Sequence, residues 1–460
     1  MKKNIKKIAA GICAASSLLT CLTSCSAEDN AMKETDKVNT SKAAQLASPV
    51  YPELPAYPVP DEDDWDKYVQ DRDDWYEAIR KLQDQPSGYK DGYNEFFIKT
   101  CAPMLENCKA ENPVYSPVGL YMALAMAAEV TDGNTRDQIL DLLERKNIED
   151  LRKGSTSIWQ ANYMDGDSTM LKIGTSLWTN NTTEYKDQTL DSLAKNYYAS
   201  VFTGDPSDEG YNEMYRSWLD EQTDGLLSDY TSDMKFDPSM ILNIVSTINF
   251  EGAWADKFYK ENTCEQTFHA PGGDTACEFM HQSEMMNYVK TDKLEAIELG
   301  MTDNGGVRFI LPAEGYTPED ILKDADSADI FTCSRLSEIS CVTIPTVNLA
   351  LPKFDVSCDN QINDCLKKLG VTDIFDQGKA DFSPLTDEKE LYVDNATQCA
   401  RVMIDEDGCK AVAITVFAIC AGAIETQETV DLSFDRPFIF EIISETGTPL
   451  FTGIINNPAA

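Results

Sequence analysis

Residues 404–438 contain an apolar segment between two polar flanks, and this segment restricts the folds that the chain can adopt. From Ala411 to Ile424 nearly every side chain is apolar. The run is shorter than the roughly 20 residues that a membrane-spanning helix needs, and it is too long to remain exposed to water. It must therefore be buried, or be available for burial. A central strand of the core is the simplest interpretation of such a run.

The residues around this segment follow a specific order. An acidic turn of Asp405, Glu406 and Asp407 ends in Gly408, and small residues, a variable apolar loop and the sequence FDRPF follow. Side chains in a strand alternate between two faces. One face of a strand here would carry Cys409, Ala411, Ala413, Thr415, Phe417 and Ile419, and the other Lys410, Val412, Ile414, Val416 and Ala418. The first face therefore begins with small residues.

This order resembles the reactive-centre loop of the serpins, the serine protease inhibitor superfamily. The resemblance continues from about residue 93 to residue 458. Six further segments carry it: NPVYSPVGLYMALAMAAEVTDGNTRDQIL (112–140), WLDEQTDGLL (218–227), ILNIVSTINFEGAW (241–254), FILPAEG (309–315), LALPKFDV (349–356) and PLFTGIINNP (449–458). The resemblance implies an α+β serpin fold with a large central β-sheet, further sheets, about nine helices and an exposed reactive-centre loop.

The resemblance also implies a function. Inhibitory serpins present the loop to a protease, and the cleaved loop then inserts as an additional strand into the large sheet. The serine or cysteine protease is carried along and is trapped as a covalent acyl-enzyme. By this resemblance, the loop hinge consists of Glu406, Gly408, Cys409, Ala411 and Ala413.

The position of the reactive bond stays open. Counting from the hinge as in the family places the bond between Gly422 and Ala423, whereas counting back from Phe438 gives a position near Thr426. Both positions lie within residues 419–426. No lysine or arginine lies near them, so we expect target proteases that prefer small or aliphatic residues.

Two groups of residues are implied to control the opening of the large sheet. In serpins a tryptophan, a lysine and the glutamate before the hinge close the top of this sheet, and Trp254, Lys353 and Glu406 occupy these places. An ion pair of Lys353 and Glu406 could hold the sheet closed. The alternative is a surface pair worth less than about 1 kcal/mol.

Lower in the sheet, serpins have a buried network of two serines, an asparagine and a histidine. The corresponding residues here are Ser116, Gly119, Ser246 and Gln398, of which only Ser116 matches. A glutamine both donates and accepts hydrogen bonds, as a neutral histidine does, so Gln398 can support a rearranged network. Ser116 precedes a proline and is expected to cap a helix whatever the family.

The loop departs from the serpin pattern at four positions. Cys409 replaces a threonine or serine, Lys410 replaces a glutamate, and Val412 and Ile414 replace small residues. The last three fall on the face opposite the small residues, so the inserting face stays small where insertion begins. We therefore expect inhibition. The alternative is a non-inhibitory serpin-fold binding or storage protein on the cell envelope.

The first 24 residues are typical of a bacterial lipoprotein signal peptide. Four lysines and a short apolar stretch precede Leu22-Thr23-Ser24-Cys25, which resembles a lipobox. We therefore expect lipidation of Cys25 and a protein anchored at the cell envelope or cell surface; a plain secretory leader would give a secreted protein instead. Residues 25–60 are polar and then proline-rich, and we expect a lipid anchor and flexible linker without a fold of its own.

Residues 61–90 predict an acidic amphipathic helical extension in front of a serpin domain of residues 91–460. Acidic residues at its start and Arg80 and Lys81 at its end suit the helix dipole. Its apolar stripe consists of Trp65, Tyr68, Val69, Trp75, Tyr76, Ile79 and Leu82. We expect this helix to pack on the domain, with a partner-binding stalk as the alternative.

The composition excludes several classes of function. The chain has 78 acidic against 39 basic residues, a net charge of −39, so nucleic acids and anionic glycans are poor partners. Its two histidines, His269 and His281, have no GxSxG motif near them, so we expect no catalytic residues and no enzyme. No metal-ligand spacing is present and no cofactor is expected. We expect a monomer that meets a target protease and contacts the membrane through its lipid anchor alone.

The 14 cysteines include no CxxC pair. Four spacings could hold disulfides, namely Cys101 with Cys108, Cys264 with Cys277, Cys333 with Cys341, and Cys358 with Cys365. Cysteines that act as small buried side chains are the alternative, and the pairing stays open at this point.

Overall fold

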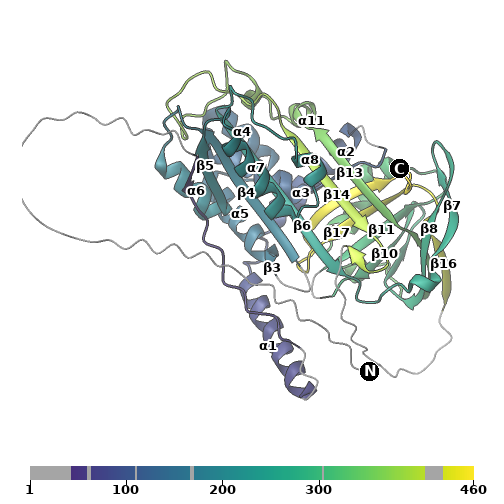
Figure 1. The fold of residues 1–460 in the computed structure, drawn as a ribbon. Coiled ribbons are helices and arrows are strands. Elements are labelled where there is room, and N and C mark those ends of the chain that lie inside the picture. The colour runs from purple at the N-terminus through teal and green to yellow at the C-terminus, as the bar shows by residue number, and fades with distance from the viewer. Residues whose placement is uncertain (1–42, 60–63, 109–110, 166–169, 303–304, 410–427) are drawn as a thin grey trace, which may run out of the picture. The chain divides into compact units, whose positions relative to one another are not determined.

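Four β-sheets form the framework of the part of the chain that the structure describes (Figure 1). The structure is a computed structural model, and it describes residues 43–59, 64–108, 111–165, 170–302, 305–409 and 428–460. The first sheet contains, in order, β1 (Ala44–Ala47), β5 (Ala199–Gly204), β4 (Met170–Asn180), β6 (Leu242–Ala253) and β15 (Gly408–Cys409), with β3 (Met164–Asp165) paired to β4.

The other three sheets lie beside the first. The second contains β2 (Val114–Tyr115), β18 (Pro449–Ile455), β17 (Phe438–Ile443), β11 (Gly306–Pro312), β10 (Leu294–Gly300) and β9 (Tyr288–Lys290). The third contains β16 (Thr429–Ser433), β12 (Thr346–Pro352), β8 (Gly273–Met285) and β7 (Cys264–Ala270). The fourth is the antiparallel pair of β13 (Phe354–Gln361) and β14 (Thr397–Ile404).

Eleven α-helices are present in the described residues, against about nine expected, and four of them are of six residues or fewer. They are α1 (Trp65–Gln83), α2 (Asp91–Asn107), α3 (Pro117–Glu129), α4 (Gly133–Leu142), α5 (Ile148–Asn162), α6 (Asp187–Tyr197), α7 (Glu209–Thr223), α8 (Ser228–Thr231), α9 (Pro318–Lys323), α10 (Ala328–Thr332) and α11 (Asn363–Lys368). Short 3-10 helices lie at Lys260–Asn262, Ala325–Ser327, Leu336–Glu338 and Asp373–Phe375. No helix in the described ranges combines the length and the apolar composition that a membrane span requires.

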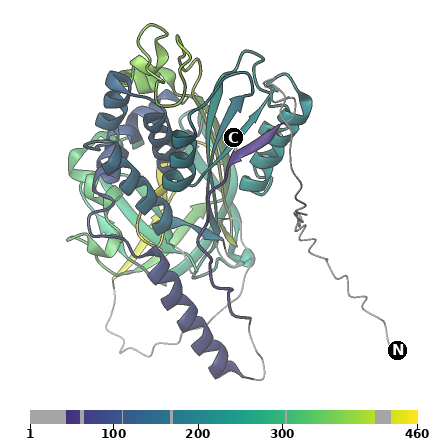
Figure 2. The same ribbon diagram turned by 90° about the vertical axis from the view of Figure 1, so that its left-hand side faces the viewer.

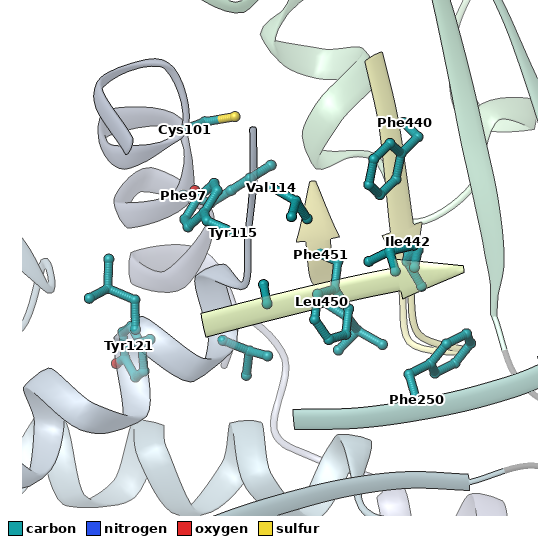
Figure 3. Close-up of a cluster of buried hydrophobic side chains, with 14 of the residues drawn as sticks. Phe97, Cys101, Val114, Tyr115, Tyr121, Phe250, Phe440, Ile442, Leu450 and Phe451 are labelled. Atoms are coloured by element: carbon teal, nitrogen blue, oxygen red, sulfur yellow. The ribbon is translucent and has the colours of Figure 1, made fainter. Parts of the chain in front are cut away.

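The core forms where continuous apolar runs meet. Strands β11, β17 and β18 are buried at every residue, as their runs of apolar side chains predict for strands covered on both faces. Helix α3 is apolar on nearly all sides and packs on β6 and β18. Figure 3 shows Phe250 of β6, Leu450 of β18 and Ile442 of β17 in this core. The aromatic and aliphatic side chains from these distant segments enclose one continuous apolar interior.

The large central sheet is divided in two. In the part of the chain that the structure describes, β6 pairs with β4 along ten residue pairs, from Met170 with Glu251 to Thr179 with Leu242. Strand β14 pairs with β13 and not with β6. Between β6 and β14, only the two residues of β15 are paired to β6.

The linker prediction is wrong for residues 43–59. Ala44–Ala47 form β1, which pairs antiparallel with β5 and extends the edge of the first sheet (Figure 2). Tyr51 stacks on Trp159 and Tyr163, with ring centroids 5.4 Å apart in each case. A sheet edge with free backbone groups and an aromatic surface can hold a short segment whose own composition suggests no fold. The other residues of the predicted linker, 25–42 and 60, lie outside the described ranges.

Helix α1 is present where the sequence predicts it. The Asp64 side chain accepts a hydrogen bond from the backbone N–H of Lys67 and caps the helix. Trp75 packs edge-on against Tyr57, and its indole N–H donates to the Pro55 carbonyl at 2.9 Å. Helix α1 also contacts α5, and its Trp75 and Ile79 belong to the core of the domain, as expected, whereas Trp65 near its start is 53% exposed. Both views show α1 pointing away from the sheets (Figures 1 and 2).

One disulfide is present among the described cysteines, and it joins Cys108 after α2 to Cys358 on β13. The four short spacings considered from the sequence are not bonded within the described ranges. The register of β7 with β8 puts Phe279, not Cys277, opposite Cys264.

Candidate functional site

A tight turn ends β14 and reverses the chain. The backbone N–H of Asp405 donates to the Gly408 carbonyl at 3.1 Å, and the N–H of Gly408 donates back at 3.3 Å. Gly408 has φ +139°, and a Cβ there would lie 2.3 Å from the Gly252 carbonyl oxygen. Glycine is therefore required at this position, both for its conformation and for the close approach to β6.

The turn directs the hinge residues onto β6. Gly408 pairs with Ala253 and Cys409 with Gly252, antiparallel, so β15 lies between β6 and the end of β14. The Cys409 side chain is buried, and this burial raises the pKa of its thiol to about 12. Cys409 therefore faces the interior, on the face that the alternation assigns to insertion.

A cavity of about 840 Å³, here named the sheet cavity, extends along the space between β6 and β14. Its walls include Ile244 and Ile248 of β6, and Ala400 and Val402 of β14. Residues of α3 line its inner side, and residues of α7 and of the segment after α7 line its outer side. Figure 1 shows α3, α7 and α8 around these strands. Because β6 and β14 are not paired to each other, each strand presents a backbone edge toward this cavity.

Glu406 connects the turn to two other parts of the chain. Its carboxylate lies 3.3 Å from Lys353 Nζ, between β12 and β13, and accepts a 2.8 Å hydrogen bond from the Thr263 hydroxyl. Burial opposes ionisation of Glu406, but hydrogen bonds from its own backbone, from Thr263 and from Lys353 outweigh it and lower its pKa. Lys353 also pairs with Glu278 at 3.0 Å.

Trp254 holds the same turn from the β6 side. Its side chain is buried, and its indole N–H donates to the Asp405 carbonyl at 2.8 Å. Beside it, Lys260 pairs with Asp407 at 3.0 Å. The structure thus brings together Trp254, Lys353 and Glu406, the three residues that the sequence assigned to the top of the sheet.

Gln398 and Ser116 form the lower polar contact. The Ser116 N–H donates to Gln398 Oε1 at 3.1 Å, and Gln398 Nε2 donates to the Ser116 carbonyl at 2.9 Å. The Ser116 hydroxyl donates to the Leu450 carbonyl at 2.7 Å and accepts from the Gly119 N–H, which caps α3. Gln398 therefore links β14 to the start of α3 through the backbone of Ser116.

Ser246 does not join this network. Its hydroxyl oxygen is buried and has no hydrogen-bond partner within the described ranges. The predicted group of Ser116, Ser246 and Gln398 is thus reduced to a pair. The remaining predicted positions, namely Ala411, Ala413, Gly422, Ala423 and Cys25, lie outside the described residues.

Sequence reasoning missed several contacts of the site. Thr263 binds Glu406 and Lys260 binds Asp407, and Arg401 of β14 donates to the Leu226 carbonyl at 3.1 Å. Tyr230 OH and Ser357 Oγ lie 2.5 Å apart and link the segment after α7 to β13. These contacts join residues that are more than 100 positions apart, so no local pattern could reveal them.

The site is a cavity between two strands that are not paired to each other. Within the described ranges, no three His, Cys, Asp or Glu side chains cluster as metal ligands would. Among the described residues, the sheet cavity has an unpaired strand edge on each side, and β15 lies at one end. Such an arrangement can accept an additional strand.

Comparisons with known proteins agree with this geometry. The family model described as "Serpin (serine protease inhibitor)" matches residues 91–458. An uncharacterized serpin-like protein of Thermococcus kodakarensis is 27% identical over 394 residues, covering 83% of this chain and 88% of that protein. A serine protease inhibitor of Cyanea capillata is 27% identical and covers 79% of this chain and 96% of its own length.

Solved structures agree as well. The native state of tengpin, a thermophilic serpin, has a TM-score of 0.71 at 25% identity and covers 81% of this chain and 95% of its own. Thyroxine-binding globulin in complex with thyroxine has a TM-score of 0.67 at 22% identity, with 80% and 98% coverage, and this shows the fold alone. Members of the family are mostly protease inhibitors rather than enzymes, and some are not inhibitors. The α+β fold, the order of its motifs and the family match together establish that this chain belongs to the serpin family.

Proposed function

We propose that this chain is an inhibitor that traps a serine or cysteine protease as a covalent acyl-enzyme by inserting its cleaved loop into its own sheet. The observation that carries the proposal is the sheet cavity between β6 and β14, with the hinge residues Gly408 and Cys409 already paired to β6 at one end. The cavity offers an inserting strand a backbone edge on each side.

The register of β15 supports insertion of the small-residue face. A strand that continued past Cys409 in the same register would place Ala411 opposite Phe250 and Ala413 opposite Ile248. On its other side, the turn register would place Ala413 opposite Ala400, which is buried. Small side chains on this face fit against the core, whereas Lys410, Val412 and Ile414 would face outward.

In the proposed reaction the protease supplies the chemistry. Its nucleophile attacks the carbonyl carbon of Gly422, the amine of Ala423 leaves, and the loop stays attached to the protease as an ester or thioester. Insertion of the loop then adds strand pairing on both sides and moves the acyl-enzyme before water can hydrolyse it. The chain contributes folding free energy and no catalytic group.

The target is proposed to prefer small or aliphatic residues. Incubation with elastase-like and subtilisin-like proteases should give an adduct that survives denaturant, whereas trypsin should give none. Mass spectrometry of the released C-terminal peptide should place the cut within residues 419–426. Cleavage without any adduct across such a panel would instead favour the non-inhibitory binding or storage protein.

The location is proposed from the N-terminal sequence alone. Cys25 would carry lipid and hold the protein, as a monomer of bacterial lipoprotein type, on a membrane at the cell envelope. Changing Cys25 to serine should move the protein from the membrane fraction to the soluble fraction. Retention of the variant in the membrane fraction would reject this anchor, and release of the wild type would favour the secreted alternative.

A further inference from the structure

Cys264 lies on the surface at the start of β7 with an imidazole beside it. Its Sγ is 3.6 Å from Nε2 of His281, which is located on β8. The Gln266 amide nitrogen lies 2.7 Å from the same Nε2 and 3.7 Å from the same Sγ. The sheet register puts all three side chains on one face, so the contacts form without distortion of the strands.

We propose that Cys264 and His281 form a thiol–imidazole pair that exchanges with small disulfides and makes Cys264 a modification site. A nucleophile and a base within hydrogen-bonding reach are the parts that thiol–disulfide exchange needs. The Gln266 amide nitrogen lies nearer to His281 Nε2 than to the sulfur, so this exposed amide must turn away from Nε2 before the imidazole can take the thiol proton.

The small disulfide is the oxidant of the exchange, and no further reactant is needed. The Cys264 proton passes to His281 Nε2, the thiolate attacks one sulfur of the small disulfide, and a new S–S bond forms as the old one breaks. The leaving thiolate then takes the proton from the imidazole and departs as a thiol. The Cys108–Cys358 disulfide is typical of an oxidising compartment, in which such disulfides are available.

Six of the other seven free cysteines in the described ranges are partly or fully buried, unlike Cys264. Cys101, Cys365 and Cys409 are buried, and burial raises the thiol pKa of Cys277 to about 11 and of Cys399 to about 12. Cys341 is the other exposed free cysteine in the described ranges, and neither His269 nor His281 forms a hydrogen bond with it there. Cys341 is therefore the matched control, because its thiol is exposed but is not hydrogen-bonded to an imidazole.

The pair lies next to the hinge. Thr263, whose hydroxyl binds Glu406, is the residue immediately before Cys264. A glutathione attached to Cys264 adds net negative charge one residue from that contact, close to two carboxylates of the turn, whereas cysteamine adds positive charge. Modification should therefore change the stability of the hinge in opposite directions for the two adducts.

The first experiment follows mixed-disulfide formation with oxidised glutathione by peptide mass spectrometry on the intact chain. Cys264 should react at least about tenfold faster than Cys341, and His281→Asn should remove this difference while His269→Asn should not. Equal rates at Cys264 and Cys341, or an unchanged rate in His281→Asn with an unchanged melting temperature, would overturn the proposal. This test does not depend on protease inhibition.

The second experiment compares chains modified at Cys264 with glutathione and with cystamine, using Cys264→Ser as the control. On incubation, the chain that carries glutathione should lose its capacity to trap a protease faster than the chain that carries cysteamine. This part rests on the proposed function. If the unmodified chain traps no protease, the proposed function is wrong, but the selective reaction of Cys264 is unaffected. If both modified chains behave like Cys264→Ser, only the link between Cys264 and the hinge is wrong.

Discussion

Lys353 Nζ lies 3.3 Å from Glu406 Oε2, and this contact joins the end of β12 to the turn from which the hinge begins. Glu406 is buried although it carries a charge, and Thr263 from a third segment binds its other oxygen. Buried charges are tolerated when they are paired and hydrogen-bonded. The conformation of the turn therefore depends on residues that lie about 50 and 140 positions before it.

Glu406→Gln should weaken this junction. The amide oxygen can still accept from Thr263, but the charge that binds Lys353 is lost, so we expect the free energy of unfolding to fall by about 1–2 kcal/mol. Spontaneous loss of inhibitory capacity on incubation should also become faster. Asp407→Asn, which removes only the exposed pair with Lys260, is the control and should have a much smaller effect.

The same junction predicts a pH dependence. Because the pKa of Glu406 is lower in the folded chain than its usual value, its contribution to stability is present above that usual value. The contribution is lost as the pH falls through the folded pKa. Urea titrations of wild type and Glu406→Gln should therefore converge at acidic pH, and a constant difference down to the lowest pH would contradict this assignment.

Ala413→Arg should convert an inhibitor into a substrate. Insertion in the registers of β15 and of the turn would place this residue between Ile248 and buried Ala400, and an unpaired buried charge costs several kcal/mol. Cleavage should occur at the same bond and a similar rate, but the ratio of adduct to cleaved chain should fall strongly. Val412→Arg, which would face outward, is the matched control. If Ala413→Arg formed as much protease adduct as the wild type does, the insertion mechanism would be wrong for this chain.

Gln398→Ala and Ser246→Ala should differ sharply. Loss of Gln398 leaves the buried N–H of Ser116 without its acceptor, which should lower the free energy of unfolding by about 1–3 kcal/mol. Ser246→Ala removes a buried hydroxyl that has no hydrogen-bond partner in the described part of the chain, so its effect should be neutral or stabilising. Chemical denaturation measures both, and equal losses would show that Ser246 belongs to the network.

Glu441 should make stability fall as the pH rises. Arg308, buried on β11, lies 2.9 Å from Glu298 and 3.2 Å from Glu441, so one positive charge faces two carboxylates. Burial raises the pKa of Glu441 to about 8, above its value in the unfolded chain. The folded chain therefore holds an additional proton between about pH 4.5 and pH 8, and the free energy of unfolding falls by up to about 1.4 kcal/mol per pH unit across this range.

Glu441→Gln should remove that slope, because the amide stays neutral at every pH in the range. Glu284→Gln, a change at an exposed glutamate on β8, should leave the slope as it is in the wild type. The measurement is a series of urea titrations between pH 5 and pH 8. A slope that survives Glu441→Gln would assign the proton to another group.

The sequence by itself determined the fold class, the helix α1 and the order of the hinge. The fold class follows from the resemblance of the motifs to the serpins, whereas helix α1 and the turn before the hinge follow from local patterns, namely an apolar stripe and a glycine at a turn. Gly408 illustrates the point, because both its conformation and its closeness to β6 require a residue without a side chain. The alternation of small residues after it likewise needs no tertiary information.

Only the tertiary structure decided which distant residues meet. The pairing of β1 with β5, the disulfide of Cys108 with Cys358, and the replacement of a four-residue network by Gln398 with the Ser116 backbone could not be derived from the sequence. Each joins segments far apart in the chain, and the choice of partner is set by strand register and packing. A local pattern states what a segment can present on its face, whereas the rest of the fold determines what lies opposite it.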